Sequence, residues 1–253
     1  MRKLNSIISK TALAMLLIAS LIFVAGHNRV AHAEDSDPFK LPGQFTGSFG
    51  FFSDYVFRGV SQTEEHPALQ GNFDWNHEKG YYLGVWGSNV NFADGDQANI
   101  EMDWYAGVAR EYYGITFDVG AVYYSYPGAN EDIELDYFEY KFGMSRDFSL
   151  VSMSGTVFYT PENTGSSGNA TYVSYDAGLP LLQGISLSAH IGYQWLTDET
   201  TATRPDYADW SLGLGYSTNG FDLSVTYVDT GLSKAECAKN CDARAVFGVS
   251  RSF

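Results

Sequence analysis

The stretch Trp210-Ser-Leu-Gly-Leu-Gly-Tyr216, followed by Ser217-Thr-Asn-Gly220 and by Phe221-Asp-Leu-Ser-Val-Thr-Tyr227, alternates between bulky apolar residues and small or polar ones. A period of two residues is typical of a β-strand whose two faces meet different surroundings. Asn-Gly between two such runs is a strong hairpin signal, because both residues tolerate positive φ. The stretch therefore predicts two antiparallel strands joined by a tight turn.

The same alternation recurs along the chain and predicts twelve strands. They cover about residues 44–56, 67–76, 81–91, 99–112, 115–126, 135–147, 150–160, 170–179, 185–196, 207–217, 221–229 and 243–253. Connections after the even-numbered strands are short, such as HEKG (77–80), whereas those after the odd-numbered strands are longer and polar, such as VFRGVSQTEEH (56–66). This regular asymmetry is typical of outer-membrane barrels, which have short periplasmic turns and longer outer loops.

The two faces of the predicted strands distinguish a membrane barrel from a soluble sandwich. In a sandwich the bulky face packs inward. Here the opposite face is rich in Gly, Ser and acids, while aromatic residues such as Trp104 and Trp195 lie near strand ends on the bulky face. Aromatic girdles of this kind border the lipid-facing band of outer-membrane barrels. We therefore predict an all-β fold, a transmembrane antiparallel up-and-down β-barrel of twelve strands over residues 44–253.

The chain begins with a segment that resembles a secretory signal peptide. Arg2, Lys3 and Lys10 precede an apolar run over 12–26, and Ala31-His32-Ala33 forms an A-x-A cleavage site. The alternative is a retained membrane anchor, but the run is shorter than the roughly 20 residues of a spanning helix. We expect export through the Sec pathway, cleavage after Ala33, and a short periplasmic segment at 34–43.

Residues 34–253 are strongly acidic. Four of the 15 Lys and Arg residues and none of the 30 Asp and Glu residues lie in 1–33, so 11 bases face 30 acids beyond it, a formal charge of −19. This charge argues against nucleic acid as a partner, because phosphate binding needs Lys and Arg. The two cysteines, Cys237 and Cys241, are expected to form a small loop disulfide in an exported protein, the alternatives being free thiols or a metal pair.

The segment GSFGFFSDYVFRGVSQTEEHPALQGNFDW, Gly47 to Trp75, together with the acidic barrel pattern after it, resembles the TorF-type porins of Gram-negative bacteria. The most specific part is Ser53 to Thr63. The resemblance covers most of residues 45–253 and implies an outer-membrane barrel assigned as a porin by its architecture. It implies no particular substrate.

The last predicted strand carries Phe247, Val249 and Phe253 on one face. A terminal Phe preceded by apolar residues at alternate positions resembles the signal read by the barrel-assembly machinery, although Arg251 departs from the usual apolar residue. The strand is also expected to pair with the first one, since closure removes both sheet edges.

The face opposite the bulky one is assigned to the lumen. The resulting pore-lining candidates are Asp54, Arg58, Asp74, Glu101, Asp103, Asp118, Glu139, Lys141, Asp176 and Asp222. Carboxylate rings favour cations in a pore. We therefore expect passive diffusion of small solutes, with a preference for cations. The alternative is that these acids are paired or hydrated structural residues in a plugged interior.

Two features of this face leave alternatives open. Arg58 is expected in the first outer loop, where it could pair with Asp54, guide a solute or serve only to fold the loop. Repeated glycines, such as Gly84, Gly107 and Gly192, could leave room for solute or could accommodate facing aromatic side chains.

Catalysis and metal binding have weaker support. Ser188 and His190 share the lumen face of one strand, but no third residue completes a catalytic site, so we expect no enzyme. The acids Asp94, Asp96, Glu101 and Asp103 match no strict Ca²⁺-loop spacing, and we expect neither metal nor cofactor. A closed barrel with partner-binding loops is the main alternative to a channel. The expected partners are outer-membrane lipid and lipopolysaccharide, the assembly machinery and small solutes.

Overall fold

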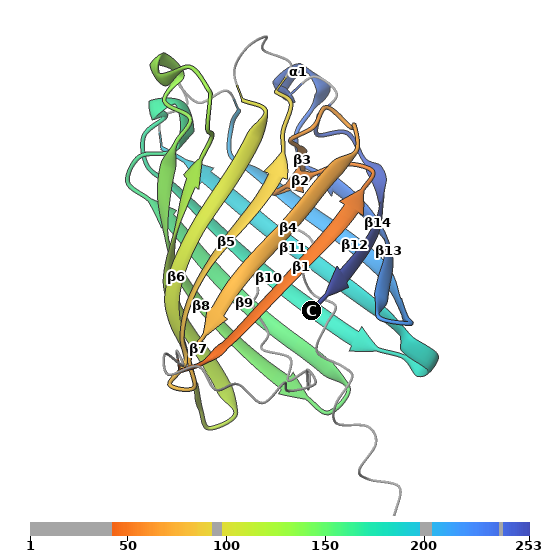
Figure 1. Cartoon of the computed structure of the whole chain (residues 1–253). Helices are drawn as coiled ribbons and strands as arrows, with labels where there is room; N and C mark the ends of the chain where they lie inside the picture. Colours follow the sequence, from red (N-terminus) through yellow and green to blue (C-terminus); the bar gives the residue numbers. More distant parts are fainter. Residues whose placement is uncertain (1–41, 93–97, 198–203, 238–239) are drawn as a thin grey trace, which may run out of the picture.

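A computed structural model describes residues 42–92, 98–197, 204–237 and 240–253. Twelve strands form one closed antiparallel barrel (Figure 1), as the alternation predicts. They are β1 (Gln44–Phe52), β4 (Ala68–Asn76), β5 (Tyr81–Asn89), β6 (Ile100–Tyr112), β7 (Ile115–Ser125), β8 (Tyr137–Phe148), β9 (Val151–Thr160), β10 (Ala170–Pro180), β11 (Ile185–Leu196), β12 (Tyr207–Thr218), β13 (Phe221–Thr230) and β14 (Arg244–Ser252).

The barrel closes between its first and last strands, as predicted. β1 pairs with β14, with Ser48 opposite Ser252. Phe253 extends the seam, because its N–H donates to the Gly47 carbonyl at 2.9 Å and its carbonyl accepts from the Gly47 N–H at 3.1 Å. The backbone of β14 is therefore paired on both sides, to β13 and to β1.

The two ends of the barrel differ in their connections. The hairpin predicted at Asn219-Gly220 is present, with φ of 50° and 80° at these residues and Thr218 opposite Phe221. We call this end, which carries the short connections and the helical turn η3 (Leu182–Gly184), the turn end. The opposite end, the loop end, carries η1 (Glu131–Ile133), η2 (Thr164–Ser166) and α1 (Lys234–Cys237). No helix of the described residues is long and apolar enough to cross a membrane.

The outer surface of the barrel carries the bulky apolar residues. Trp104 is 50% exposed and Phe247 is 60% exposed. Their strand neighbours Asp103 and Val246 point inward and are buried. A surface of this kind is stable only against an apolar medium, and closure of the sheet leaves no unpaired edge there.

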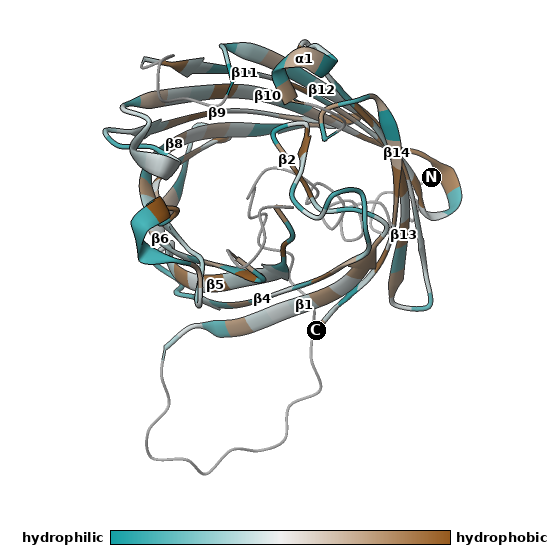
Figure 2. Ribbon diagram, turned by 90° about the horizontal axis from the view of Figure 1, so that it is seen from above, coloured by the Kyte–Doolittle hydropathy of each residue, from teal (hydrophilic) through white to brown (hydrophobic). Residues whose placement is uncertain are grey.

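The first strand differs from its predicted length. The alternation predicts a strand to residue 56, but β1 ends at Phe52. Residues 53–66, which we call the inner segment, turn into the barrel and form the short hairpin of β2 (Val56–Phe57) and β3 (Val60–Ser61), which lies inside the ring of strands (Figure 2). The prediction of an outer loop here was wrong, because the apolar side chains of this segment are buried inside the barrel.

Candidate functional site

The inner segment reverses direction at Arg58 and Gly59. The turn has two residues, with Phe57 opposite Val60, and φ is 47° at Arg58 and 79° at Gly59. Positive φ at both central positions defines a type I′ turn, for which Asn-Gly is the usual sequence. An arginine in this backbone region is strained. Its presence indicates that the side chain makes compensating contacts.

The Arg58 side chain is enclosed by polar and aromatic groups of the barrel wall. Its Nη2 donates to Glu139 Oε2 at 2.6 Å, and its Nη1 donates to Gln194 Oε1 at 2.8 Å. Its Cζ lies 4.3 Å from the ring centre of Tyr172 and 5.4 Å from that of Phe158. Arg58 is 5% exposed and Glu139 is 1% exposed, so this ion pair is fully removed from water.

Two further groups fix the base of the inner segment. Asp54 accepts hydrogen bonds from the hydroxyls of Ser61 at 2.7 Å and Thr63 at 2.8 Å, and its other oxygen lies 3.0 Å from Arg244 Nε. Burial raises the pKa of Asp54, and the two hydroxyls and Arg244 oppose this shift. The base of the segment is therefore held to β14 by a second ion pair.

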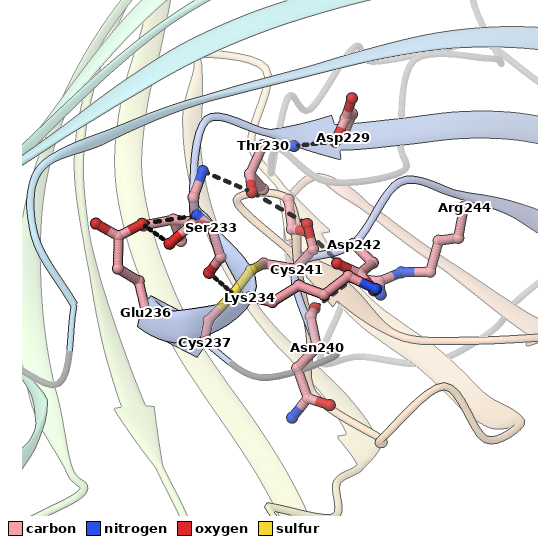
Figure 3. The surroundings of a disulfide bond; sticks show 12 residues. Asp229, Thr230, Ser233, Lys234, Glu236, Cys237, Asn240, Cys241, Asp242 and Arg244 are labelled. Carbon is pink, nitrogen blue, oxygen red and sulfur yellow. Dashed lines mark hydrogen bonds and ion pairs between the residues drawn. A yellow bond between two sulfur atoms is a disulfide. The ribbon is translucent and has the colours of Figure 1, made fainter.

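A disulfide at the loop end lies next to the same segment (Figure 3 shows the disulfide and its surroundings). Cys237 and Cys241 are joined, and the carbonyl of Asn240 between them accepts the Ser61 N–H at 2.7 Å. The same carbonyl accepts from Arg244 Nη2 at 2.5 Å. The disulfide loop predicted from the cysteine spacing thus contacts both the inner segment and Arg244, which is paired with Asp54 of that segment.

Aromatic side chains fill the interior next to the inner segment. The buried cluster comprises Tyr82, Tyr105, Val122, Tyr124, Tyr137, Phe158 and Tyr172. A Cβ at Gly192 would lie 2.0 Å from the Tyr172 hydroxyl, and one at Gly107 would lie 2.3 Å from that of Tyr82. Of the two explanations offered for the inward glycines, the structure supports space for facing aromatic rings.

Most of the charged pore-lining candidates lie in ion pairs. Arg58 pairs with Glu139, Lys141 with Asp118 at 2.6 Å, Asp54 with Arg244, and Asp176 with His190 at 2.7 Å. The suggestion that Arg58 pairs with Asp54 was wrong, because the hairpin carries Arg58 away to β8 and β11.

The other four candidates interact with neighbouring polar side chains, and Asp103 does so with Glu101. Asp74 accepts from Asn72 and Tyr105, Glu101 accepts from the Tyr55 hydroxyl at 2.9 Å, and Asp222 accepts from Ser217 at 2.5 Å. Asp103 is buried, and its Oδ1 has no hydrogen-bond partner among the described residues. Asp94 and Asp96 lie outside the described residues.

Several interior residues were missing from the prediction. One of them is Asp209, which lies 2.9 Å from Nε2 of His190; the lumen-facing position of His190 itself was predicted, and its Nδ1 faces Asp176. Successive side chains of a strand point to opposite faces, so the outward position of Trp210 places its neighbour Asp209 inward. The alternation in the sequence was therefore sufficient to find Asp209. Nothing in the sequence indicated the roles of Arg244 and Gln194, since their partners are far away along the chain. Both His190 nitrogens face carboxylates, which leaves none for Ser188.

The interior near the turn end is different. Its inward positions are mostly serine and glycine, and they are partly exposed to solvent. Examples are Ser152, Ser186, Ser188, Ser224 and Ser250. The lumen is therefore filled towards the loop end and accessible to solvent towards the turn end.

Solved porin structures share this architecture. The alignment with the KdgM porin covers 82% of this chain and 99% of the KdgM chain, at 9% sequence identity and a TM-score of 0.56. KdgM in complex with disordered oligogalacturonate gives the same TM-score at 8% identity and the same coverage. The alignment with the NanC porin covers 83% of this chain and 99% of the NanC chain, at 9% sequence identity and a TM-score of 0.53. At these identities the likeness shows the fold, that of a twelve-stranded outer-membrane porin.

Sequence comparisons place the chain in a family without assigning it an activity. No curated protein matches it significantly. The TorF-type resemblance stays a prediction. A family model described as "Bacterial protein of unknown function (Gcw_chp)" matches residues 33–253. The chain therefore belongs to the Gcw_chp family.

Proposed function

We propose that the protein is a porin-like channel of the Gram-negative outer membrane that passes small solutes by diffusion and prefers cations. The observation that carries the proposal is the closed barrel with an apolar outer surface and a charged interior that is solvent-accessible towards the turn end. Twelve strands lie between the eight of a barrel filled by side chains and the 16–18 of porins with aqueous channels, so the size of this barrel permits a solute path. The fold shared with KdgM and NanC supports the same reading.

The proposed placement in the membrane follows the asymmetry of the connections. Short connections face the periplasm in bacterial barrels and long ones face outward. The turn end is accordingly periplasmic, and the inner segment and the disulfide loop lie towards the cell exterior. Cleavage after Ala33 and recognition of the terminal Phe253 strand by the assembly machinery, with lipid and lipopolysaccharide around the barrel, complete this proposal.

The preference for cations rests on the interior charges. Inward-facing acids of the described residues are Asp54, Asp74, Glu101, Asp103, Glu111, Asp118, Glu139, Asp147, Asp176, Asp209 and Asp222. They outnumber the bases Arg58, Lys141, His190 and Arg244, so the interior remains net negative after pairing. KdgM was solved with oligogalacturonate, which as a chain of uronic acids is a polyanion. An acidic lumen disfavours such a solute, which is why we propose cations here.

A closed structural barrel is the second candidate function. The inner segment and the aromatic cluster fill the lumen towards the loop end, and the Arg58–Glu139 pair is fully buried there. In that case the outer loops would carry the function by binding a partner, and the interior would serve stability alone.

Conductance of the refolded protein in a planar bilayer under a KCl gradient distinguishes the channel from the closed structural barrel. We expect discrete channels whose reversal potential favours K⁺. Asp222→Asn, at a partly exposed inward position near the turn end, should weaken the preference, whereas Glu131→Gln, at an exposed position in η1, should leave it unchanged. A folded barrel that never conducts would contradict the channel and favour the closed barrel.

A further inference from the structure

The groups around Arg58 belong to the barrel wall. Glu139, Phe158, Tyr172 and Gln194, which we call the cation cage, come from the consecutive strands β8, β9, β10 and β11. Tyr172 lies directly opposite Phe158 on one side and Gln194 on the other in the strand register. All four cage residues therefore belong to hydrogen-bonded sheet, and the inner segment adds the ring of Phe57, whose centre lies 4.6 Å from Arg58 Cζ.

The chemistry of the cage fits a planar guanidinium. Two acceptors, Glu139 Oε2 and Gln194 Oε1, receive one donor each from the two ends of the Arg58 fork, while the rings of Tyr172 and Phe158 lie within cation–π distance. A guanidinium offers donors in a rigid plane, whereas an ammonium is a compact point charge. These contacts are expected to favour a guanidinium over an ammonium and over a neutral molecule.

The present occupant reaches the cage from a two-residue turn. Arg58 lies in the left-handed region at φ 47°, where most side chains are disfavoured. Strained residues of this kind persist where other contacts hold them and gather at functional sites. Here the compensating contacts are those that the cage would offer equally to a free guanidinium compound.

We propose that the cation cage is a binding site for guanidinium-bearing solutes, and that Arg58 is a built-in occupant which such a solute displaces. The proposal rests on the proposed channel function, whose solute class it narrows. Displacement of Arg58 would also free the inner segment from the wall of β8 to β11, so that solute entry and opening of the filled half would be one event.

The test is calorimetric titration of the full barrel in detergent, with Arg58→Ala to empty the cage. The probe is methylguanidinium, and methylurea (its neutral planar analogue) and methylammonium are the comparators. We expect Arg58→Ala to bind methylguanidinium about tenfold or more tightly than either comparator, since the charged hydrogen bonds and ring contacts favour it. Arg58→Ala combined with Glu139→Gln should lose this discrimination.

Arg110→Ala is the matched control, because Arg110 lies outside the cage on an exposed part of β6 and its ring contact is with Tyr81. Arg58→Gln, which keeps part of the stem that fills the site, is titrated in parallel in case the alanine variant does not fold. Equal binding of methylguanidinium and methylurea to a folded Arg58 variant would overturn the proposal. Because Arg58 still competes for the cage in Arg110→Ala, that variant should bind methylguanidinium more weakly than Arg58→Ala does, and either equally tight binding or no binding at all by Arg110→Ala would also overturn it. Since binding is measured without a membrane, a barrel that binds but does not conduct contradicts only the channel.

Discussion

The two halves of the lumen are built on the same strands but filled in opposite ways. Towards the loop end, inward side chains are large or charged and nearly inaccessible, as with Tyr124 at 2% and Glu139 at 1% exposure. Towards the turn end, inward positions such as Ser186 and Ser188 stay partly exposed. The barrel therefore supplies a wall of uniform construction, and the side chains together with one inward-folded segment decide whether the space is occupied.

The difference has an energetic side. Each buried ion pair must offset the cost of taking two charges out of water, which is met only by good geometry and additional hydrogen bonds. At the loop end Glu139 has both, because it accepts from Arg58 at 2.6 Å and from the Tyr124 hydroxyl at 3.0 Å. A change that removes one partner there should cost far more than the same change nearer the turn end.

The largest expected effect is that of Glu139→Ala. It leaves the Arg58 guanidinium buried without its anion, which typically costs about 3–5 kcal/mol in the free energy of unfolding. Asp222→Ala, at a partly exposed inward position near the turn end where the carboxylate accepts from the Ser217 hydroxyl, should cost about 1 kcal/mol. Urea unfolding of both variants in detergent measures the difference. Equal losses in the free energy of unfolding would show that removing a carboxylate costs the same in both halves of the lumen.

Gly59→Ala should have the next largest effect. Gly59 has φ of 79°, and an added Cβ would lie 2.4 Å from Thr230 Cγ2 and 2.8 Å from Asp209 Cβ. Backbone strain of about 1 kcal/mol and overpacking of about 1–3 kcal/mol should both appear. We also expect higher bilayer conductance, because the turn would be pushed away from β12 and β13.

Gly128→Ala is the matched control for that change. Its φ is 85°, but an added Cβ would meet nothing within 4 Å, so only the backbone strain applies. Both variants are compared by thermal unfolding and by conductance. An unchanged conductance in Gly59→Ala would show that the inner segment does not limit the path.

Gly192→Ala addresses the packing of the aromatic cluster. The new Cβ would lie 2.0 Å from the Tyr172 hydroxyl, and overpacking of this kind costs about 1–3 kcal/mol. At Gly143 the nearest atom would be 3.6 Å away, an ordinary contact, so Gly143→Ala should be close to neutral. Thermal unfolding of the two variants compares a filled site with a roomy one. Similar melting temperatures would argue against tight filling around Tyr172.

The smallest expected effect is that of replacing both cysteines by serine. The disulfide closes a short loop, which limits its contribution to at most about 2 kcal/mol. Because Asn240 accepts the Ser61 N–H, the loss should also increase amide exchange at Ser61. Hydrogen exchange measured by mass spectrometry on peptides from 53–66 tests this, with peptides from β9 as the internal reference. Unchanged exchange would mean that Arg244 and Asp54 hold the segment without the loop.

The sequence alone determined the architecture of the barrel. Alternation with a period of two predicts the strands and their two faces, and the lengths of the connections distinguish the two ends of the barrel. Both patterns can be read from residues that are neighbours along the chain. All twelve strands were found, nearly all with ends within two residues of those observed. The error at residues 53–56 has the same origin, since an inward-folded segment can continue the alternation of the strand before it.

Only the tertiary structure decided what fills the barrel. Arg58 meets Glu139 across 81 residues of sequence and Gln194 across 136, and no local pattern relates such positions. The same holds for Asp54 with Arg244. These contacts exist because closure of the sheet brings distant strands around one space, and they depend on geometry that appears only when the ring is complete.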